Sequence, residues 1–317
     1  MLLSICDPAD PRLDDIRDLK HSDKEKNLVF AEGPLVAGRL VESRFPVRAV
    51  FGFGGRLASF MEHYGAELES RGVPVYEITR EIMGEVAGYD MHRGLLVSAD
   101  KPEPLSVGEV IQGARTLVIL EGVGDHENIG SIFRNAAGMG VDGVLFGAST
   151  ADPLYRRSVR VSMGHVLRTP FAHLEGTPTT WQRSLDQLRE AGWWLVSLTP
   201  ADDAVELKDA IGGHDKVAFL VGGEGPGLTT HAMRATDVRA KIPMAEGTDS
   251  LNVATSAAIA FYERMRSRSK CRMRCRSAPR NCAQRLRRPR PTRFAAATDA
   301  SASSANSSPV RSSGASS

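Results

Sequence analysis

The segment at residues 128–135, NIGSIFRN, sets a single guanidinium among small and amide side chains. On a helical wheel its apolar residues share one arc, and the opposite arc carries the polar and small ones. This polar arc consists of Asn128, Ser131, Arg134, Asn135 and Gly138. A ligand could approach this face beside the Arg134 guanidinium, because small residues leave the backbone open. The alternative is that Asn128 only caps a helix and that Arg134 is solvated.

A second segment, VAFLVGGEGPGLT, gathers glycines directly after an apolar strand and before a predicted helix. Its turn-forming residues are Gly222, Gly223, Gly225, Pro226 and Gly227. Such a loop lets the backbone come close to a flat ligand, and Glu224 is its one charge. The spacing differs from the G-x-G-x-x-G fingerprint of dinucleotide sites. An ordinary turn between a strand and a helix is the alternative.

A third segment, KIPMAEGTDSLNVATSAAIAFYE, joins the end of a short strand to a helix of small residues. Ser250 or Asp249 is expected to be the N-cap of this helix. Asn252 is less easily explained by structure alone, because asparagine adds little stability inside a first helical turn. The alanines that follow suit close helix packing or a subunit contact.

Metal and nucleophile sites are not expected. The cysteines between residues 271 and 282 lack a fourth ligand and sit in an arginine-rich stretch. No serine or cysteine nucleophile motif surrounds His126, His165 or His173. We therefore predict a protein without a bound metal.

Two α/β units are predicted to position these segments. From residue 28 to 100 short apolar runs alternate with amphipathic stretches, which indicates a small domain at 1–100. Residues 101–114, with two prolines and two glycines, are typical of an exposed linker. A second domain is predicted at 115–266, followed by a disordered tail at 267–317 that is rich in arginine, serine and alanine.

The second unit alternates strand and helix patterns, which predicts a mostly parallel sheet. Its candidate strands are TLVILEG, DGVLFGA, WWLVSL and KVAFLVGG, and its candidate helices lie near 129–140, 156–164, 179–191, 229–235 and 250–266.

Hydropathy and charge indicate where the protein is expected to reside and how it could bind nucleic acid. No run approaches the ~20 apolar residues that span a bilayer, and the first residues lack the pattern of a signal peptide, so we expect a cytoplasmic protein. The net charge of +2 is split unevenly: residues 266–317 hold thirteen cations and one acid, and the remainder holds 27 cations and 37 acids. A nucleic-acid surface must therefore be a local patch or involve the basic tail.

In this order, the three segments resemble the three motifs of the SpoU family of RNA 2′-O-methyltransferases, within the SPOUT class. The resemblance covers residues 115–265. The first family pattern, N-x-G-x-x-x-R, is matched by Asn128, Gly130 and Arg134. The second, G-x-E-x-x-G, is matched by Gly222, Glu224 and Gly227. The third, I-P-M followed by S-L-N-V, is matched by residues 242–244 and 250–253. His126 stands where proline is common in the family, and Ala254 where serine is frequent.

The resemblance implies a trefoil-knotted, mostly parallel α/β methyltransferase domain. The first part of the chain is similar to the small α/β substrate-binding domain related to ribosomal protein L30e that many members carry. Further implications are S-adenosyl-L-methionine as cofactor, a structured rRNA or tRNA as substrate, and a homodimer. The cofactor would be lined by Leu198, Thr199, Gly222, Gly223, Ile242, Met244 and Leu251.

The resemblance also implies roles in catalysis. Arg134 would lie close to the partner's cofactor, Glu224 would order the glycine loop, and Asn128, Ser250 and Asn252 would hold Arg134 and the ribose. A guanidinium with a pKa above about 12 is a poor base. We expect Arg134 to bind the adjacent phosphate and to stabilise the developing alkoxide.

Two other functions fit parts of the pattern. One is a non-catalytic RNA-binding or ribosome-assembly factor that retains the fold, for which the motifs show no damage. The other is a different nucleotide-using α/β enzyme, but neither the Walker nor the Rossmann spacing is present.

Overall fold

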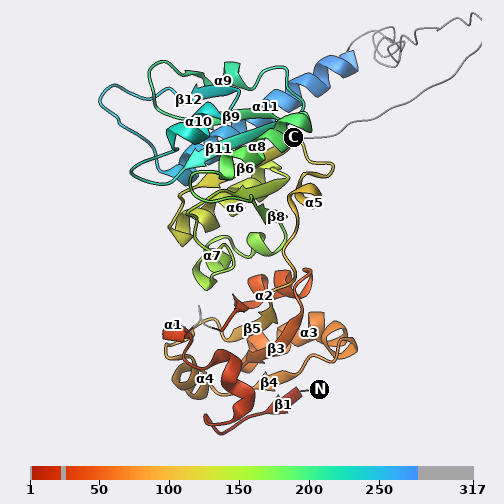
Figure 1. Cartoon of the computed structure of the whole chain (residues 1–317). Helices are drawn as coiled ribbons and strands as arrows, with labels where there is room; N and C mark the ends of the chain where they lie inside the picture. The colour runs from red at the N-terminus through yellow and green to blue at the C-terminus, as the bar shows by residue number, and fades with distance from the viewer. Residues whose placement is uncertain (1, 23–25, 278–317) are drawn as a thin grey trace, which may run out of the picture. The chain divides into compact units, whose positions relative to one another are not determined.

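The structure is a computed structural model that describes residues 2–22 and 26–277 (Figure 1). Residues Met1–Cys271 group into one compact unit. Its strands form two separate sheets, one before residue 101 and one after residue 115. The placement of a domain boundary at 101–114 stays a prediction.

The first sheet has five strands in the order β1-β4-β3-β5-β2. They are β1 (Leu2–Ser4), β2 (Leu28–Glu32), β3 (Val47–Gly52), β4 (Val75–Glu77) and β5 (Leu95–Asp100). Strand β5 runs opposite to the other four, so its pairs with β2 and β3 are antiparallel and the other pairs are parallel. The helices of this part are α1 (Leu19–Ser22), α2 (Pro34–Val41), α3 (Gly54–Ser70) and α4 (Arg80–Ala87), with the 3-10 helix η1 (Pro11–Ile16). This confirms that the first part of the chain is α/β.

The second sheet has seven strands in the order β10-β12-β9-β11-β6-β7-β8, and every pair is parallel. They are β6 (Thr116–Glu121), β7 (Gly143–Phe146), β8 (Phe171–His173), β9 (Trp194–Leu198), β10 (Val205–Glu206), β11 (Val217–Gly222) and β12 (Val238–Lys241). The four predicted strands correspond to β6, β7, β9 and β11. The sequence pattern did not predict β8 and β10, because two or three residues are too few to show a period.

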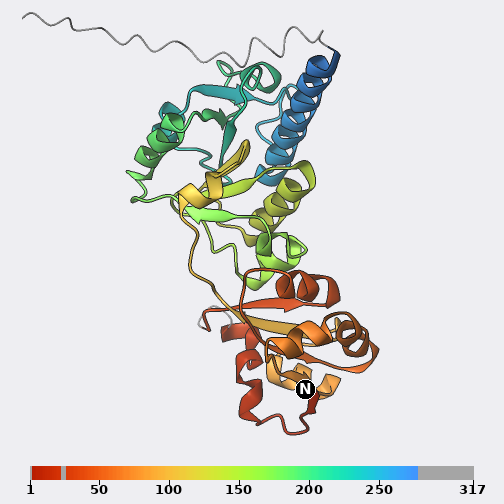
Figure 2. The same cartoon turned by 90° about the vertical axis from the view of Figure 1, so that its right-hand side faces the viewer.

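Both faces of the seven-stranded sheet are covered by helices (Figure 2). Strand β6, inside the sheet, points Val118 and Leu120 toward one core cluster and Leu117 and Ile119 toward another. This burial on both sides explains why the strand reads as a continuous apolar run.

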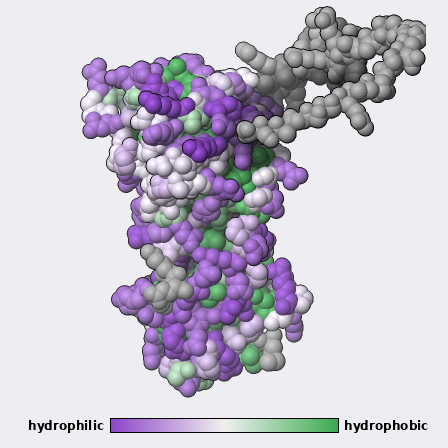
Figure 3. Space-filling view, viewed as in Figure 1, coloured by the Kyte–Doolittle hydropathy of each residue, from purple (hydrophilic) through white to green (hydrophobic). Residues whose placement is uncertain are grey.

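The helices of this second part are α5 (Val107–Ile111), α6 (His126–Met139), α7 (Arg156–Val161), α8 (Leu185–Glu190), α9 (Leu207–Ala210), α10 (Thr230–Arg234) and α11 (Val253–Ser277), with the 3-10 helices η2 (His165–Leu167) and η3 (Trp181–Ser184). Helix α5 lies within the stretch predicted as an exposed linker. Ser106 and Glu109 form a capping box there, and Val110 is buried in the core. On the surface, hydrophilic residues cover most of the face of the molecule that Figure 3 shows.

Helix α11 lies beside α6 and corrects the prediction of a tail that is disordered from residue 267. The helix continues to Ser277 because no glycine or proline interrupts it before Pro279. The rest of the predicted tail, 278–317, lies outside the described residues.

Arg264 joins α11 to the starts of β6 and β11. Its side chain is 4% exposed and donates to the backbone oxygens of His214 and Arg115. Burial lowers the pKa of Arg264 to about 10. The buried guanidinium therefore fastens this helix across one face of the sheet.

Candidate active site

The carboxyl ends of three neighbouring parallel strands, β9, β11 and β12, border a cavity of about 540 Å³. Ligands of open α/β sheets bind at this end of the strands. All seven residues predicted to contact a cofactor line the cavity, together with Glu224, Ser250 and Asn252. Sequence reasoning missed further lining residues, among them Pro200, Met233 and Ser256, because no motif marks them.

The glycine loop at 222–228 folds back on itself beside this cavity. Gly223 and Gly227 pair across the loop, and the Gly227 N–H donates to the Gly223 oxygen over 3.1 Å. A Cβ on Gly222 would lie 2.2 Å from the Gly227 carbonyl carbon, and one on Gly223 would lie 2.0 Å from the Gly122 oxygen. Gly225 and Gly227 adopt positive φ angles of 88° and 67°. These positions therefore need glycine either for close approach or for backbone conformation.

Three polar side chains from three distant segments meet beside the cavity. The Asn128 side-chain amide donates to Glu224 Oε1 over 2.9 Å. The Asn252 amide donates to Asn128 Oδ1 over 2.8 Å and to Glu224 Oε1 over 3.0 Å. The structure thus brings together one predicted residue from each of the three motifs.

Asn252 also caps helix α11, which corrects the expected N-cap. Its Oδ1 accepts from the N–H groups of Ala254 and Thr255, at 2.9 and 3.2 Å. Ser250 and Asp249 precede the helix by three and four residues, since α11 begins at Val253. The side-chain oxygen of Asn252 therefore stabilises the start of the helix, and its side-chain nitrogen binds Asn128 and Glu224.

Asn128 does not cap helix α6, because Asp125 holds that position and accepts from the Glu127 N–H. Asn128 lies in the first helical turn and is only 7% exposed. Its side chain is thus used in the polar cluster rather than in a cap.

Arg134 stands apart from the cavity of its own chain. It lies on α6 six residues after Asn128, is exposed and does not line the cavity. Burial is the largest cause of the lowered pKa of His165. The positive charges of Arg39, Arg168 and Arg134 lower this pKa further. Arg134 therefore lies outside the cavity, in the neighbourhood of His165, Arg39 and Arg168.

Gly130, the glycine of the first motif, has a packing role. A Cβ at this position would lie 2.8 Å from Val161 Cβ and 2.9 Å from the Ser158 oxygen, both on α7. Ser158 in turn donates from its hydroxyl to the His126 oxygen. The glycine lets α6 and α7 approach closely, which fixes the start of the helix that carries Asn128.

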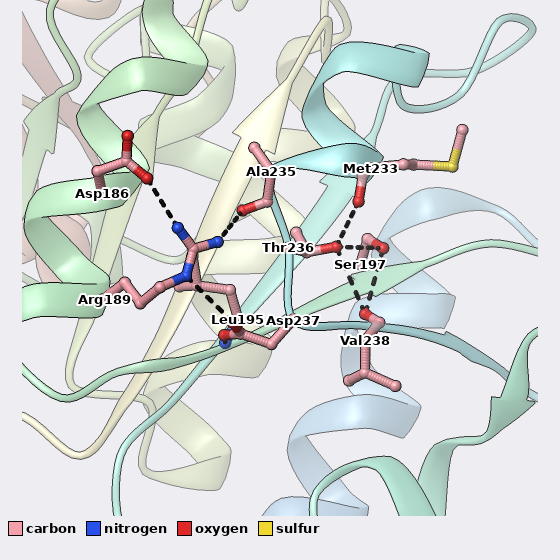
Figure 4. Close-up of polar contacts among 9 residues, drawn as sticks. All are labelled: Asp186, Arg189, Leu195, Ser197, Met233, Ala235, Thr236, Asp237 and Val238. Atoms are coloured by element: carbon pink, nitrogen blue, oxygen red, sulfur yellow. Dashed lines mark hydrogen bonds and ion pairs between the residues drawn. The ribbon is translucent and has the colours of Figure 1, made fainter.

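The segment between α10 and β12 is fastened to β9 next to the cavity (Figure 4). Thr236 donates to the Met233 oxygen over 2.7 Å and shares a hydrogen bond with the buried Ser197 hydroxyl. Asp237 accepts from the Leu195 N–H and pairs with Arg189. These contacts position Met233, which lines the cavity.

Among residues 2–22 and 26–277, no three His, Cys, Asp or Glu side chains gather as they would around a metal ion. None of the helices in the same part of the chain is both long and apolar enough to cross a bilayer. Cys282 lies outside the described residues, and the absence of a metal stays a prediction.

Comparison with known proteins places this geometry in a family. Residues 115–262 match the SpoU rRNA methylase family. A relative from Mycobacterium tuberculosis, named as an uncharacterized tRNA/rRNA methyltransferase, is 52% identical over 272 residues, which are 83% of this chain and 91% of the relative. The 23S rRNA (guanosine-2′-O-)-methyltransferase RlmB of Bordetella pertussis is 28% identical over 76% of this chain and 97% of its own length.

A solved structure agrees with the sequence relatives. The AdoMet-bound rRNA methyltransferase of Sinorhizobium meliloti has a TM-score of 0.71 and 26% identity, and the match covers 84% of this chain and 98% of that one. The fold of this chain thus occurs in an AdoMet-bound rRNA methyltransferase. On this sequence identity and coverage, the chain belongs to the SpoU rRNA methylase family.

Proposed function

We propose that this protein transfers the methyl group of S-adenosyl-L-methionine to a ribose 2′-hydroxyl of a structured RNA. The observation that carries the proposal is the contact of Asn128, Glu224 and Asn252, one residue from each motif, beside a single cavity. If the glycine loop were only a turn and Asn252 only a helix cap, the three segments would not need to contact one another.

The cavity suits the cofactor in size and lining. Its volume of about 540 Å³ lies within the range of small-molecule sites. Leu198, Ile242, Met244 and Leu251 offer apolar contacts for an adenine ring, and the glycine loop offers open backbone for polar groups. The relative from Sinorhizobium meliloti holds AdoMet in its crystal structure. When bound, the cofactor supplies an electrophilic methyl group.

The reaction is an in-line displacement. A bond forms between the ribose oxygen and the methyl carbon, the carbon–sulfur bond breaks, S-adenosylhomocysteine leaves and the hydroxyl proton passes to a base or to water. Most of the rate would come from alignment of the two reactants. Glu224 orders the loop through Asn128 and Asn252, and Ser250 lies at the cavity wall where it can contact the ribose.

Arg134 would act in the cavity of a second subunit. It is exposed and lies outside the cavity of its own chain, so a homodimer is needed to bring it to the reacting atoms. There its guanidinium would hold a phosphate and stabilise the developing negative charge on the oxygen.

The substrate is an rRNA or a tRNA in the cytoplasm. The name of the Bordetella relative, a guanosine-2′-O-methyltransferase of 23S rRNA, favours the ribose oxygen as the acceptor. We further propose that the five-stranded part is the substrate-binding domain related to ribosomal protein L30e. The loops after β9, β11 and β12 would form the trefoil knot, which is consistent with their convergence on one cavity.

Labelled methyl transfer to purified rRNA and tRNA tests the function. We expect label in one RNA class, and digestion to nucleosides should yield a 2′-O-methylated nucleoside. Label on a base would contradict the ribose assignment. RNA binding that needs no cofactor and incorporates no label would instead support the non-catalytic assembly factor.

A further inference from the structure

Glu121 is an acidic residue that no motif includes and that lies buried next to the glycine loop. It is the last residue of strand β6, follows Thr116 and four apolar residues of that strand, and is 5% exposed. Burying a carboxyl group is costly unless its oxygens are hydrogen-bonded. The contacts of Glu121 therefore indicate what the burial achieves.

The carboxyl group accepts hydrogen bonds from Trp181, from Thr229 and, over 3.5 Å, from Gln182. The Trp181 indole N–H donates to Oε1 over 2.9 Å, and Trp181 is completely buried. The Thr229 backbone N–H donates to Oε2 over 2.8 Å, and the Thr229 hydroxyl donates to Oε1 over 3.0 Å. The same hydroxyl accepts from the Ala232 N–H, so its proton is directed toward Glu121.

Glu121 also contacts the beginning of the glycine loop. Its backbone oxygen accepts from the Gly223 N–H over 2.8 Å, and its strand partner is Gly222. Thr229 follows the loop directly and caps helix α10. One residue thus holds the loop at both ends, by its main chain at Gly223 and by its side chain at Thr229.

We propose that Glu121 is a positioning residue of the cofactor site. It fixes the 222–228 loop, and with it Glu224, in the folded-back conformation that lines the cavity. The inference rests on the proposed function, since the loop is taken to bind S-adenosyl-L-methionine. A loop that is ordered in advance avoids the entropy loss of ordering on binding, which strengthens affinity.

The variant Glu121→Gln tests this role with little change in volume. The new NH2 group would face the N–H donors of Trp181 or Thr229, so one end of the loop loses its attachment. We expect the dissociation constant for S-adenosyl-L-methionine, measured by calorimetry on the full chain, to rise about tenfold or more. In methyl-transfer kinetics the KM for the cofactor should rise, and the KM for RNA should stay within about twofold.

Asp142→Asn is the matched control. The Asp142 carboxyl group accepts from the backbone N–H groups of Arg115 and Thr116, at 2.8 and 2.9 Å, at the opposite end of the same strand. Both N–H groups donate to the same oxygen, which asparagine keeps, so the substitution removes the negative charge and weakens these hydrogen bonds. The free energy of unfolding should fall, but cofactor affinity should stay unchanged. Equal cofactor affinity in the two variants would overturn the positioning role.

Amide hydrogen exchange provides a readout that needs no cofactor. In the free protein, the Gly223 and Gly227 N–H groups should exchange faster in Glu121→Gln than in wild type or in Asp142→Asn. If Glu121→Gln does not fold, Thr229→Ala removes the hydroxyl contact with Glu121, together with the cap of α10, but keeps the backbone contact. It should show the same changes in smaller size. Unchanged loop exchange and affinity in Thr229→Ala would then contradict the inference.

The wild-type titration separates the two proposals. If wild type binds the cofactor and Glu121→Gln binds it equally well, only the role of Glu121 is wrong. If wild type does not bind it, the proposed function fails and this inference fails with it.

Discussion

The side-chain amide of Asn252 donates a hydrogen bond to Asn128 Oδ1 over 2.8 Å, although the two residues are 124 positions apart. The same amide reaches Glu224, and the Asn252 oxygen holds the first turn of α11. The contact therefore ties the start of α6, the glycine loop and the start of α11 together. If this cluster shapes the reaction centre, its members should affect methyl transfer more than they affect stability.

Asn128→Ala removes two of the three hydrogen bonds in this cluster. We expect kcat to fall about tenfold or more, because alignment of the reactants is lost. The free energy of unfolding should fall by about 1–2 kcal/mol, as for other buried hydrogen bonds. Steady-state kinetics with labelled cofactor and urea unfolding measure the two effects.

Asn135→Ala is the control for this prediction. Asn135 lies on the same helix and donates to the Ala254 oxygen over 3.3 Å, away from Glu224. The substitution should leave kcat within about twofold, because the groups aligned for reaction are untouched. A loss of kcat as large as that of Asn128→Ala would mean that the cluster acts only through helix packing.

Arg134→Ala should reduce methyl transfer by at least about a hundredfold, because a charge that stabilises the transition state is removed. Cofactor affinity should be nearly unchanged, since the Arg134 guanidinium is expected to bind a phosphate of the RNA rather than the cofactor. Co-expression of the Arg134→Ala chain with an Asn252→Ala chain tests whether each site combines residues of two subunits. Mixed dimers hold one complete site if Arg134 serves the partner, which predicts roughly a quarter of the wild-type rate in the mixture. No recovery would place Arg134 in its own subunit's site.

Two glycines of α6 should respond oppositely to alanine. Gly130→Ala would place a Cβ against Val161 and Ser158, so the free energy of unfolding should fall by about 1–3 kcal/mol. Gly138 has open space around it, and Gly138→Ala should raise the free energy of unfolding by about 0.5–1 kcal/mol. Thermal or urea unfolding decides the matter, and a similar sign for both variants would refute the packing role of Gly130.

Acid should weaken the fold in part through His165. Burial, followed by Arg39, Arg168 and Arg134, lowers the pKa of His165 in the folded chain. As the pH falls below about 6.5, the unfolded chain therefore takes up this proton first, and the free energy of unfolding decreases. Urea unfolding at about pH 7.5 and about pH 5.5 should show a smaller difference for His165→Asn than for wild type. Equal differences would mean that other groups carry the acid sensitivity.

The sequence predicted the individual residues of this site better than the hydrogen bonds between them. The motif patterns marked Asn128, Glu224 and Asn252, and Asn252 was also poorly explained by local structure. Their mutual hydrogen bonds were not predictable, since they depend on how β11, α6 and α11 pack. Local capping rules favoured Ser250 or Asp249, but the tertiary contact moved the helix start to Val253.

Glu121 shows a second limit of sequence reasoning. The only signal is an acid at the end of the apolar run TLVILE, and such a residue is ordinarily exposed. Its partners Trp181 and Thr229 lie 60 and 108 positions away, so only the folded chain reveals them. In contrast, the parallel sheet was predictable because strand and helix patterns alternate along the chain.

Mapping of 2′-O-methyl groups in total RNA tests the central claim most directly. RNA from cells with and without this gene should differ at one or a few riboses, and a wild-type copy should restore them. A copy that carries Asn252→Ala, made in equal amount, should not. An identical methylation map with and without the gene would contradict the assignment of this protein as a ribose methyltransferase.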